Sequence, residues 1–147
     1  MKAKQIDTRK NRIRNIASWR KAEFQVANML RHRGVSCDAI GGQNKPWDII
    51  TENGQKIEVK FASFNKKRQW HCNLRDIQWT HADWFVLVLA GLPSASKHDR
   101  ACLYVILRPI HKKAIGLTVR SLFNRFAKNV NDWQRIVRAE GRANEQS

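Results

Sequence analysis

The sequence is poor in acidic residues. Its 147 positions hold 12 Asp and Glu against 28 Lys and Arg, which gives a formal net charge of +16. Such an excess bears on solubility and partners rather than on fold. The natural partner of so positive a chain is a polyanion, because phosphates attract Lys and Arg. A membrane surface would also attract the charge, but no long basic amphipathic helix of the lipid-binding type is present.

Long hydrophobic runs and cysteine pairs are also missing. No run of about eighteen apolar residues occurs, so we expect no transmembrane helix and no membrane partner. The first residues are charged rather than apolar, so we expect no signal peptide. Cys37, Cys72 and Cys102 are odd in number and far apart, without a Cys-x-x-Cys or a zinc-type Cys/His pair. These features favour reduced, packed thiols in a cytoplasmic protein.

The length and composition predict one globular domain. A chain of 147 residues with 42% hydrophobic residues can bury a core of its own. No internal repeat divides it. Residues 2–20 carry seven basic side chains and one acid, and residues 108–147 carry nine basic residues and three acids. We therefore expect a basic N-terminal arm over residues 1–15, a domain over residues 16–140 and a frayed tail over residues 141–147.

Residues 47–60 predict a β-hairpin, because two largely apolar runs flank an Asn-Gly pair. A three-residue loop over 52–54, with Gly54 at positive φ, places Ile49 opposite Ile57. A two-residue loop would place Ile49 opposite Glu58 and mix the two faces, so the apolar pattern favours the longer loop. The residues expected on the core face are Trp47, Ile49, Ile57, Val59 and Phe61.

The same register gathers charged side chains on the other face. Glu58 and Lys60 are two residues apart on one strand and point the same way. Asp48 would stand opposite Glu58, with Cβ atoms about 5 Å apart. Two carboxylates that close repel each other unless a cation or a proton lies between them. A hard cation such as Mg²⁺ suits oxygen ligands; the alternative is an ordinary solvated face of an edge hairpin.

A third acidic residue lies on the helix expected over residues 16–32, which Gly34 should end. Glu23 falls within the apolar stripe of that helix, which otherwise holds Trp19, Val26, Ala27 and Leu30. A buried carboxylate without a partner is costly, so Glu23 needs a metal ion or a cation such as Lys60 nearby. Alternatively, Glu23 lies at the margin of the stripe and reaches solvent or a local Arg.

Further elements are expected on both sides of the hairpin. Residues 35–40 predict a strand, and residues 41–46 a glycine-containing loop. Residues 70–74 predict a strand with Trp70, Cys72 and Leu74 on one face and His71 and Asn73 on the other. Residues 75–81 predict a short helix or an irregular link. A lone His on a polar strand face is more often structural or exposed, so His71 is left out of the catalytic group.

The second half of the chain predicts strands and then helices. Residues 84–89 are a continuous apolar run, which favours a central strand buried on both faces. Residues 102–107 predict a strand paired with it, after a loop over 91–100. Thr118 can cap a helix through residue 127, and Asn131 can cap a last short helix. The apolar residues of these helices are Val119, Leu122, Phe123 and Phe126 in the first, and Trp133, Ile136 and Val137 in the second.

Asp48, nine intervening residues and then Glu58-Val59-Lys60 resemble the Asp…(Asp/Glu)-x-Lys signature of the PD-(D/E)XK nuclease superfamily. In that family an acidic residue on the preceding helix, here Glu23, often joins the site. The resemblance covers residues 16–90 and implies an α/β fold, a restriction-endonuclease-like αβββαβ core with a mixed central sheet flanked by helices. Two features depart from the pattern: Trp47 precedes Asp48 where the family has Pro, and the second helix has a weak signal.

The resemblance implies a Mg²⁺-dependent DNA endonuclease in which Mn²⁺ can substitute. Its catalytic residues would be Glu23, Asp48, Glu58 and Lys60, with Lys60 beside the attacking water. The metal would bind Asp48, Glu58, the carbonyl of Val59, and Glu23 directly or through water. Cleavage would be site-specific and double-stranded, as in homing or restriction-like enzymes, or directed at Holliday junctions. One site per chain cuts one strand, which implies a homodimer or a homotetramer.

Two readings from other classes stay open at this point. Besides a nuclease, the sequence allows a non-catalytic nucleic-acid-binding module whose charge does the binding. It also allows a structural or assembly protein that packages RNA. In all of these readings, basic and polar residues in three segments would contact phosphates. They are Lys10, Arg12, Arg14 and Arg20 near the start, Gln43, Asn44 and Lys45 in the loop before the hairpin, and Lys66, Lys67 and Arg68 after it.

Overall fold

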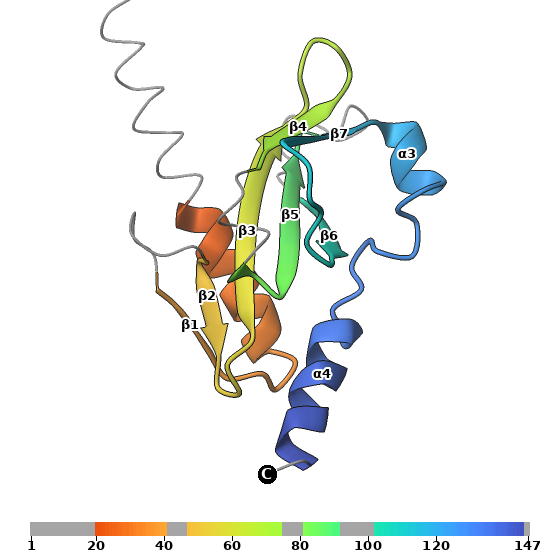
Figure 1. The fold of residues 1–147 in the computed structure, drawn as a ribbon. Coiled ribbons are helices and arrows are strands. Elements are labelled where there is room, and N and C mark those ends of the chain that lie inside the picture. The colour runs from red at the N-terminus through yellow and green to blue at the C-terminus, as the bar shows by residue number, and fades with distance from the viewer. Residues whose placement is uncertain (1–19, 41–46, 75–80, 92–101, 146–147) are drawn as a thin grey trace, which may run out of the picture.

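A five-stranded mixed sheet forms the centre of the protein (Figure 1). The computed structural model describes residues 20–40, 47–74, 81–91 and 102–145. The strand order is β1-β2-β3-β5-β6; β3 and β5 are parallel and the other neighbours are antiparallel. A second, two-stranded sheet pairs β4 with β7. The strands are β1 (Cys37–Ala39), β2 (Ile49–Thr51), β3 (Lys56–Ser63), β4 (Trp70–Asn73), β5 (Trp84–Ala90), β6 (Leu103–Leu107) and β7 (Ala114–Leu117).

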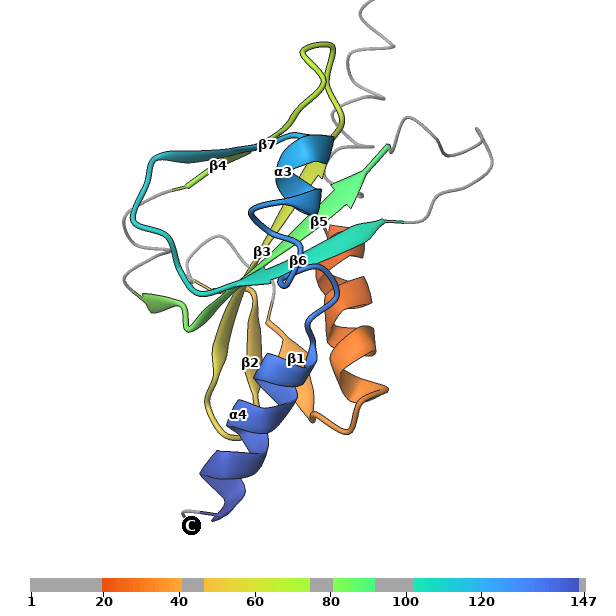
Figure 2. The same ribbon diagram turned by 90° about the vertical axis from the view of Figure 1, so that its right-hand side faces the viewer.

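Both faces of the central sheet are covered (Figure 2). A helix over residues 20–31 and the start of α4 (Gln134–Glu145) pack on one face. The β4–β7 sheet and α3 (Val119–Phe123) pack on the other. β5 is buried on both sides, as the apolar run predicts: Trp84, Val86 and Val88 enter the first core, and Phe85, Leu87 and Leu89 enter the second. The mixed sheet flanked by helices agrees with the fold class expected from the sequence.

The hairpin has the register that the apolar pattern predicts. Ile49 pairs with Ile57, and Gly54 has φ of +86° in the three-residue loop. The Thr51 N–H donates to the Gln55 carbonyl at 3.0 Å and closes the loop. Ile49 and Ile57 are fully buried in the first core, so the apolar face decides the register here.

Several other elements match their predictions. The N-terminal helix ends at residue 31, and Gly34 has φ of +84°, a conformation that glycine adopts readily. In β4, Trp70 and Cys72 are buried, whereas His71 and Asn73 are exposed. β6 pairs with β5 as expected. The expected arm, residues 16–19, the loop over 41–46 and nearly all of the link over 75–81 lie outside the described residues.

The helix after Thr118 is shorter than predicted. Thr118 caps it together with Ser121, but α3 ends at Phe123 instead of residue 127. Beyond it, Asn129 and Asn131 bond with the backbone of β6, which a helix through residue 127 would not allow. This tertiary pairing outweighs the local helix signal. As a result Phe123, which was expected in the packed stripe, is 76% exposed.

Three further features of the second half differ from expectation. Asn131 has φ of +56° and lies three residues before the first residue of α4, so it does not act as the expected cap. α4 continues past Gly141 to Glu145, although the tail was expected to fray from Gly141. β7 was not anticipated, because Gly116 weakens its strand signal. In the part of the chain that the structure describes, no helix is long and apolar enough to cross a membrane.

Candidate active site

Three elements bring the predicted catalytic residues together. Glu23 comes from the N-terminal helix, Asp48 precedes β2, and Glu58 and Lys60 lie on β3. Glu23 is 2%, Asp48 5% and Glu58 4% exposed. Neither a solvated hairpin face nor a solvent-reaching position for Glu23 agrees with this burial. Buried carboxylates need partners, so their immediate neighbours decide what the site can do.

Asp48 occupies a special position at the end of the hairpin ladder. The regular pairing of β2 with β3 stops at Ile49, and the N–H of Asp48 donates to the Ile57 carbonyl at 2.9 Å. The Asp48 Oδ2 atom accepts the N–H of Val59 at 2.8 Å. A side-chain oxygen therefore takes the place of a backbone acceptor. This bond fixes Asp48 against β3, beside Glu58, as the predicted register requires.

Burial and mutual repulsion shift the titration of the carboxyl groups. Burial, followed by the charge of Asp48, raises the pKa of Glu23 from 4.5 to about 8. The same two causes, in the same order, raise the pKa of Glu58 from 4.5 to about 8. Burial also raises the pKa of Asp48, but hydrogen bonds from Val59, Glu23 and Glu58 and the charge of Lys60 oppose the rise. Asp48 is thus the carboxyl group whose ionised form receives the most stabilising contacts in the site.

Lys60 supplies the positive charge of the site. Its Nζ atom lies 3.6 Å from Glu58 Oε1, and its side chain is 18% exposed. The charge of Lys60 lowers the pKa of Glu58 and of Asp48 against the effect of burial. Partial exposure leaves the ammonium group accessible from solvent, unlike the carboxyl groups behind it.

The donor chemistry of the site fits a hard divalent cation. Carboxylate oxygens are the ligands such cations prefer, and Glu23 Oε1 is a buried oxygen without a hydrogen-bond partner. The N–H and C=O of one strand residue point to the same side, so the Val59 carbonyl lies on the Asp48 side, past the end of the β2 ladder. However, no three acidic, His or Cys side chains of the described residues already converge as a metal cage.

The expected phosphate contacts fall into two groups. Lys66, Lys67 and Arg68 are exposed at the turn that joins β3 to β4, and Arg68 has φ of +60°. Arg20 is exposed at the first described turn of the N-terminal helix, where its charge lowers the pKa of Glu23. The other six residues, Lys10, Arg12, Arg14, Gln43, Asn44 and Lys45, lie outside the described residues.

Cys72 is a neighbour of the site that was not anticipated, and Trp47 differs from its expected position. Cys72 on β4 lies close enough to Lys60 for that charge to lower its pKa, although burial raises it to about 11 overall. His71 lies on the opposite, exposed face of β4. Trp47, which was expected on the core face of the hairpin, is only half-buried and belongs to neither core. Its indole N–H is buried without a partner, and Lys56 Nζ lies 4.4 Å from its ring centroid. The alternation in residues 70–74 predicts that Cys72 is on the buried face of β4. Its proximity to Lys60 depends on how β4 packs in the tertiary structure, which the sequence pattern does not indicate.

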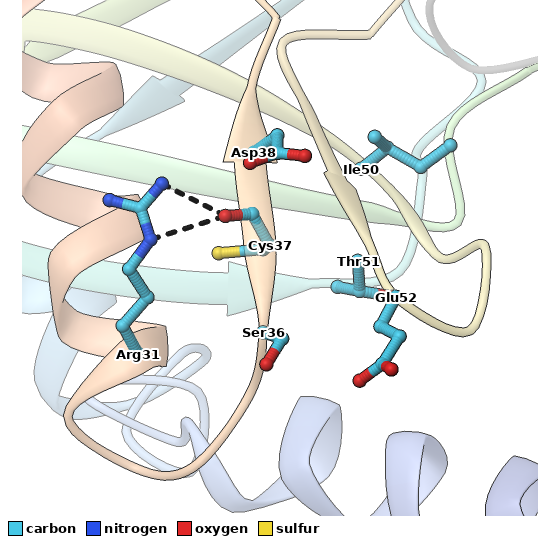
Figure 3. A pocket seen from close by; sticks show the side chains of 7 residues that line it. All are labelled: Arg31, Ser36, Cys37, Asp38, Ile50, Thr51 and Glu52. Atoms are coloured by element: carbon cyan, nitrogen blue, oxygen red, sulfur yellow. Dashed lines mark hydrogen bonds between the residues drawn. The ribbon is translucent and has the colours of Figure 1, made fainter.

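A polar hollow of about 350 Å³ lies elsewhere, beside β1 and the hairpin (Figure 3). Arg31 reaches across from the N-terminal helix, and two of its guanidinium nitrogens donate to the Cys37 carbonyl at 2.9 and 3.1 Å. The hydrogen bonds of that guanidinium therefore hold β1 against the helix. The carboxylates of Asp38 and Glu52 point to different ends of the hollow. We therefore place the candidate active site at the carboxyl cluster and not here.

The fold is similar to that of a known protein. The solved structure of a bacterial homing endonuclease, I-Ssp6803I, superimposes with a TM-score of 0.58 and 16% identity, over 84% of this chain and 92% of that chain. At this identity the likeness concerns the fold. No family model matches the sequence, and no curated protein matches it either.

Proposed function

We propose that this chain is a metal-dependent DNA endonuclease of the PD-(D/E)XK type. The observation that carries the proposal is the convergence of Glu23, Asp48, Glu58 and Lys60 from three elements into one buried site. The net charge of +16 supports DNA as the substrate, because such a surface attracts phosphates. The likeness of the fold to a bacterial homing endonuclease is consistent with the proposal.

Asp48, Glu58 and the Val59 carbonyl would hold Mg²⁺, or Mn²⁺ in its place, and Glu23 would join directly or through water. When bound, the cation lowers the pKa of water and neutralises charge on the phosphodiester and the leaving oxygen. Carboxyl ligands must be ionised to bind. Glu23 and Glu58 would therefore release their protons as the site is loaded, and the repulsion that raises both pKa values would disappear.

Lys60 would act on the substrate side of the site. Its ammonium is partly exposed and is held by Glu58 at 3.6 Å. From there it would hold the attacking water and stabilise negative charge that develops on the phosphate. These contributions operate in the transition state, so we expect Lys60 to affect kcat more than DNA affinity.

One catalytic site per chain cuts one strand. Site-specific double-strand cleavage, in the manner of homing or restriction-like enzymes, would therefore use a homodimer or a homotetramer. The protein would act inside the cell, where the DNA is. A Holliday junction resolvase has the same site requirement and is the alternative within this class.

The test is cleavage of plasmid DNA and of a labelled four-way junction, with Mg²⁺ and with EDTA. We expect Mg²⁺-dependent cutting that falls at least about 10²-fold in the Asp48→Ala and Lys60→Ala variants, the scale of losing a main electrostatic contribution. Glu52→Ala removes an exposed carboxylate and is the matched control. Discrete linear fragments would identify a site-specific enzyme, and symmetric nicks in the junction a resolvase. Cutting that persists in Asp48→Ala would contradict the proposal.

A second candidate is a non-catalytic nucleic-acid-binding module. Two observations favour it: the charge of Lys60 already offsets part of the negative charge of the carboxyl cluster, and the described carboxyl groups do not form a ready metal cage. In that case the protein binds DNA tightly but cuts neither substrate with Mg²⁺ or Mn²⁺. Asp48→Ala then leaves every measured property except stability unchanged.

A further inference from the structure

α4 has two faces of opposite character. Its inner face packs on the first core, where Ile136 is fully buried and Glu140 is 6% exposed. Its outer face carries Arg135, Arg138 and Arg142, all of them exposed. The helix lies across the loop end of the β2–β3 hairpin (Figures 1 and 2).

The inner face is attached to the hairpin that carries the candidate active site. Glu140 Oε1 accepts the Thr51 hydroxyl at 2.8 Å and the Gln55 amide at 3.2 Å. The Asn53 amide donates to the Glu140 carbonyl at 3.0 Å. The Gln55 side-chain oxygen in turn accepts the indole N–H of Trp84 at 2.6 Å. These bonds hold α4 in a fixed position relative to Asp48 and Glu58.

The outer face is an arginine stripe. Arg135, Arg138 and Arg142 follow a spacing of three and four residues, so they share one side of the helix over about 10 Å. Arg135 pairs with Asp132 at 2.7 Å. Arg138 and Arg142 have no ion-pair partner among residues 20–40, 47–74, 81–91 and 102–143, whose side chains the structure describes. Like charges four residues apart disfavour a helix, so the fold gains nothing from this pair, whereas guanidinium groups bind phosphate well.

Gly141 adds an independent observation on the same side of α4. Glycine is a poor helix residue because of its conformational freedom. A Cβ atom at Gly141 would meet nothing within 4 Å, so packing does not require glycine here. Gly141 is exposed and flanks the arginine stripe: it lies about 60° around the helix from Arg138 and about 100° from Arg142. It leaves the helix backbone bare, which allows a ligand to approach closely.

We propose that the outer face of α4 seats the phosphodiester backbone of duplex DNA, with Arg138 and Arg142 on phosphates and Gly141 at the point of closest approach. The choice of DNA as the ligand rests on the proposed function. Thr51 lies three strand residues from Asp48, and Gln55 lies three from Glu58, which is about 10 Å in each case. The diameter of α4 adds about 10 Å to this distance. The stripe therefore contacts the duplex about six base pairs from the cleaved bond, at about 3.4 Å per pair.

The test measures binding of a labelled 30-base-pair duplex in EDTA, at several salt concentrations. The double variant R138Q/R142Q should bind about tenfold more weakly at low salt, and its log–log salt slope should fall by about two, because two phosphate contacts are lost. The double variant K112Q/K113Q removes two exposed lysines from another surface and is the control. Equal losses in the two double variants would overturn the proposal.

Gly141→Gln supplies a test with effects in opposite directions. Glutamine favours the helix over glycine, so the Tm should stay equal or rise, while the longer side chain covers the bare backbone and weakens DNA binding severalfold. Unchanged affinity would overturn the role of Gly141. Because these measurements need no cleavage, a protein that binds through α4 but never cuts contradicts the proposed function alone. A protein that cuts while both variants bind normally contradicts this inference alone.

Discussion

At the scale of single residues, the candidate site is a problem of proton and charge balance. Glu23 and Glu58 are both buried and both interact with Asp48, and Lys60 offsets only part of the negative charge. Without a bound cation, protons must neutralise the rest of the negative charge. The raised pKa values of the two glutamates, about 8 in each case, express this requirement.

The pH dependence of stability follows from these values. Between about pH 5 and pH 8 the folded, metal-free protein keeps protons on Glu23 and Glu58 that the unfolded chain has lost, since both pKa values rise from 4.5 to about 8. The free energy of unfolding therefore falls as pH rises through this window. We expect the Tm in EDTA to be about 5 °C or more lower at pH 8.5 than at pH 5 on this account.

The control is the double variant E23Q/E58Q, which cannot titrate at these positions. The difference in Tm between the wild-type protein and this variant isolates the two glutamates from the rest of the chain. Mg²⁺ should raise the Tm of the wild-type protein at pH 8.5 more than at pH 5, because protons compete with the cation. A wild-type Tm that rises with pH relative to the variant would contradict this account.

At the scale of elements, the hairpin depends on α4, which is far away in the sequence. Glu140 bonds to Thr51 and Gln55, and its second carboxylate oxygen is buried without a partner. A buried carboxylate with two donors stabilises the contact only while both donors remain. The arrangement therefore makes the loop of the hairpin sensitive to a change in the last helix.

We expect Glu140→Ala to lower the free energy of unfolding by about 2–4 kcal/mol, because two hydrogen bonds to a charged group are lost and their donors stay buried. Glu140→Gln keeps one acceptor and should cost less. Urea denaturation followed by far-UV circular dichroism measures both. Glu52→Ala, at an exposed position of the same loop, should change stability by less than about 0.5 kcal/mol. Equal effects of the changes at Glu140 and Glu52 would show that the contact does not stabilise the hairpin.

The hairpin and its register could be predicted from the sequence, because only one pairing of the two strands forms a continuous apolar face. The burial of Glu23 could also be predicted, since helical periodicity alone places it in the apolar stripe of its helix. Neither β7 nor the early end of α3 could be predicted in this way. Both depend on distant partners: β4 for Ile115 and its neighbours, and the edge of β6 for Asn129 and Asn131. The bond from Val59 to the Asp48 carboxylate is likewise a tertiary detail that alternation cannot give.

At the scale of the whole molecule, positive charge is the dominant feature. The excess of 16 basic over acidic residues repels itself in the compact state. Attraction offsets only part of this repulsion, because 12 acidic residues face 28 basic ones. Arg135–Asp132, at 2.7 Å, is one attractive pair. Dissolved salt therefore screens far more repulsion than attraction.

We expect the Tm to rise by about 3 °C or more when NaCl increases from about 50 mM to 500 mM, since the Debye length falls well below the spacing of most of these charges. Differential scanning calorimetry at constant pH measures the shift, in EDTA so that the carboxyl cluster stays without a cation. Glucose at the same osmolality is the control for general solvent effects. A Tm that falls with NaCl would mean that attractive pairs outweigh the repulsion.

The hydrogen bond from Val59 to Asp48 has a consequence for observing the protein. The backbone amide of Val59 donates to a carboxylate oxygen instead of to a neighbouring strand, so its proton senses the electron density on that oxygen directly. Any event that changes the charge of Asp48, whether proton uptake or cation capture, shifts the ¹H and ¹⁵N resonances of this one amide. In uniformly ¹⁵N-enriched protein Val59 therefore serves as a natural spectroscopic probe inside the site, and no mutation or attached reporter group is needed.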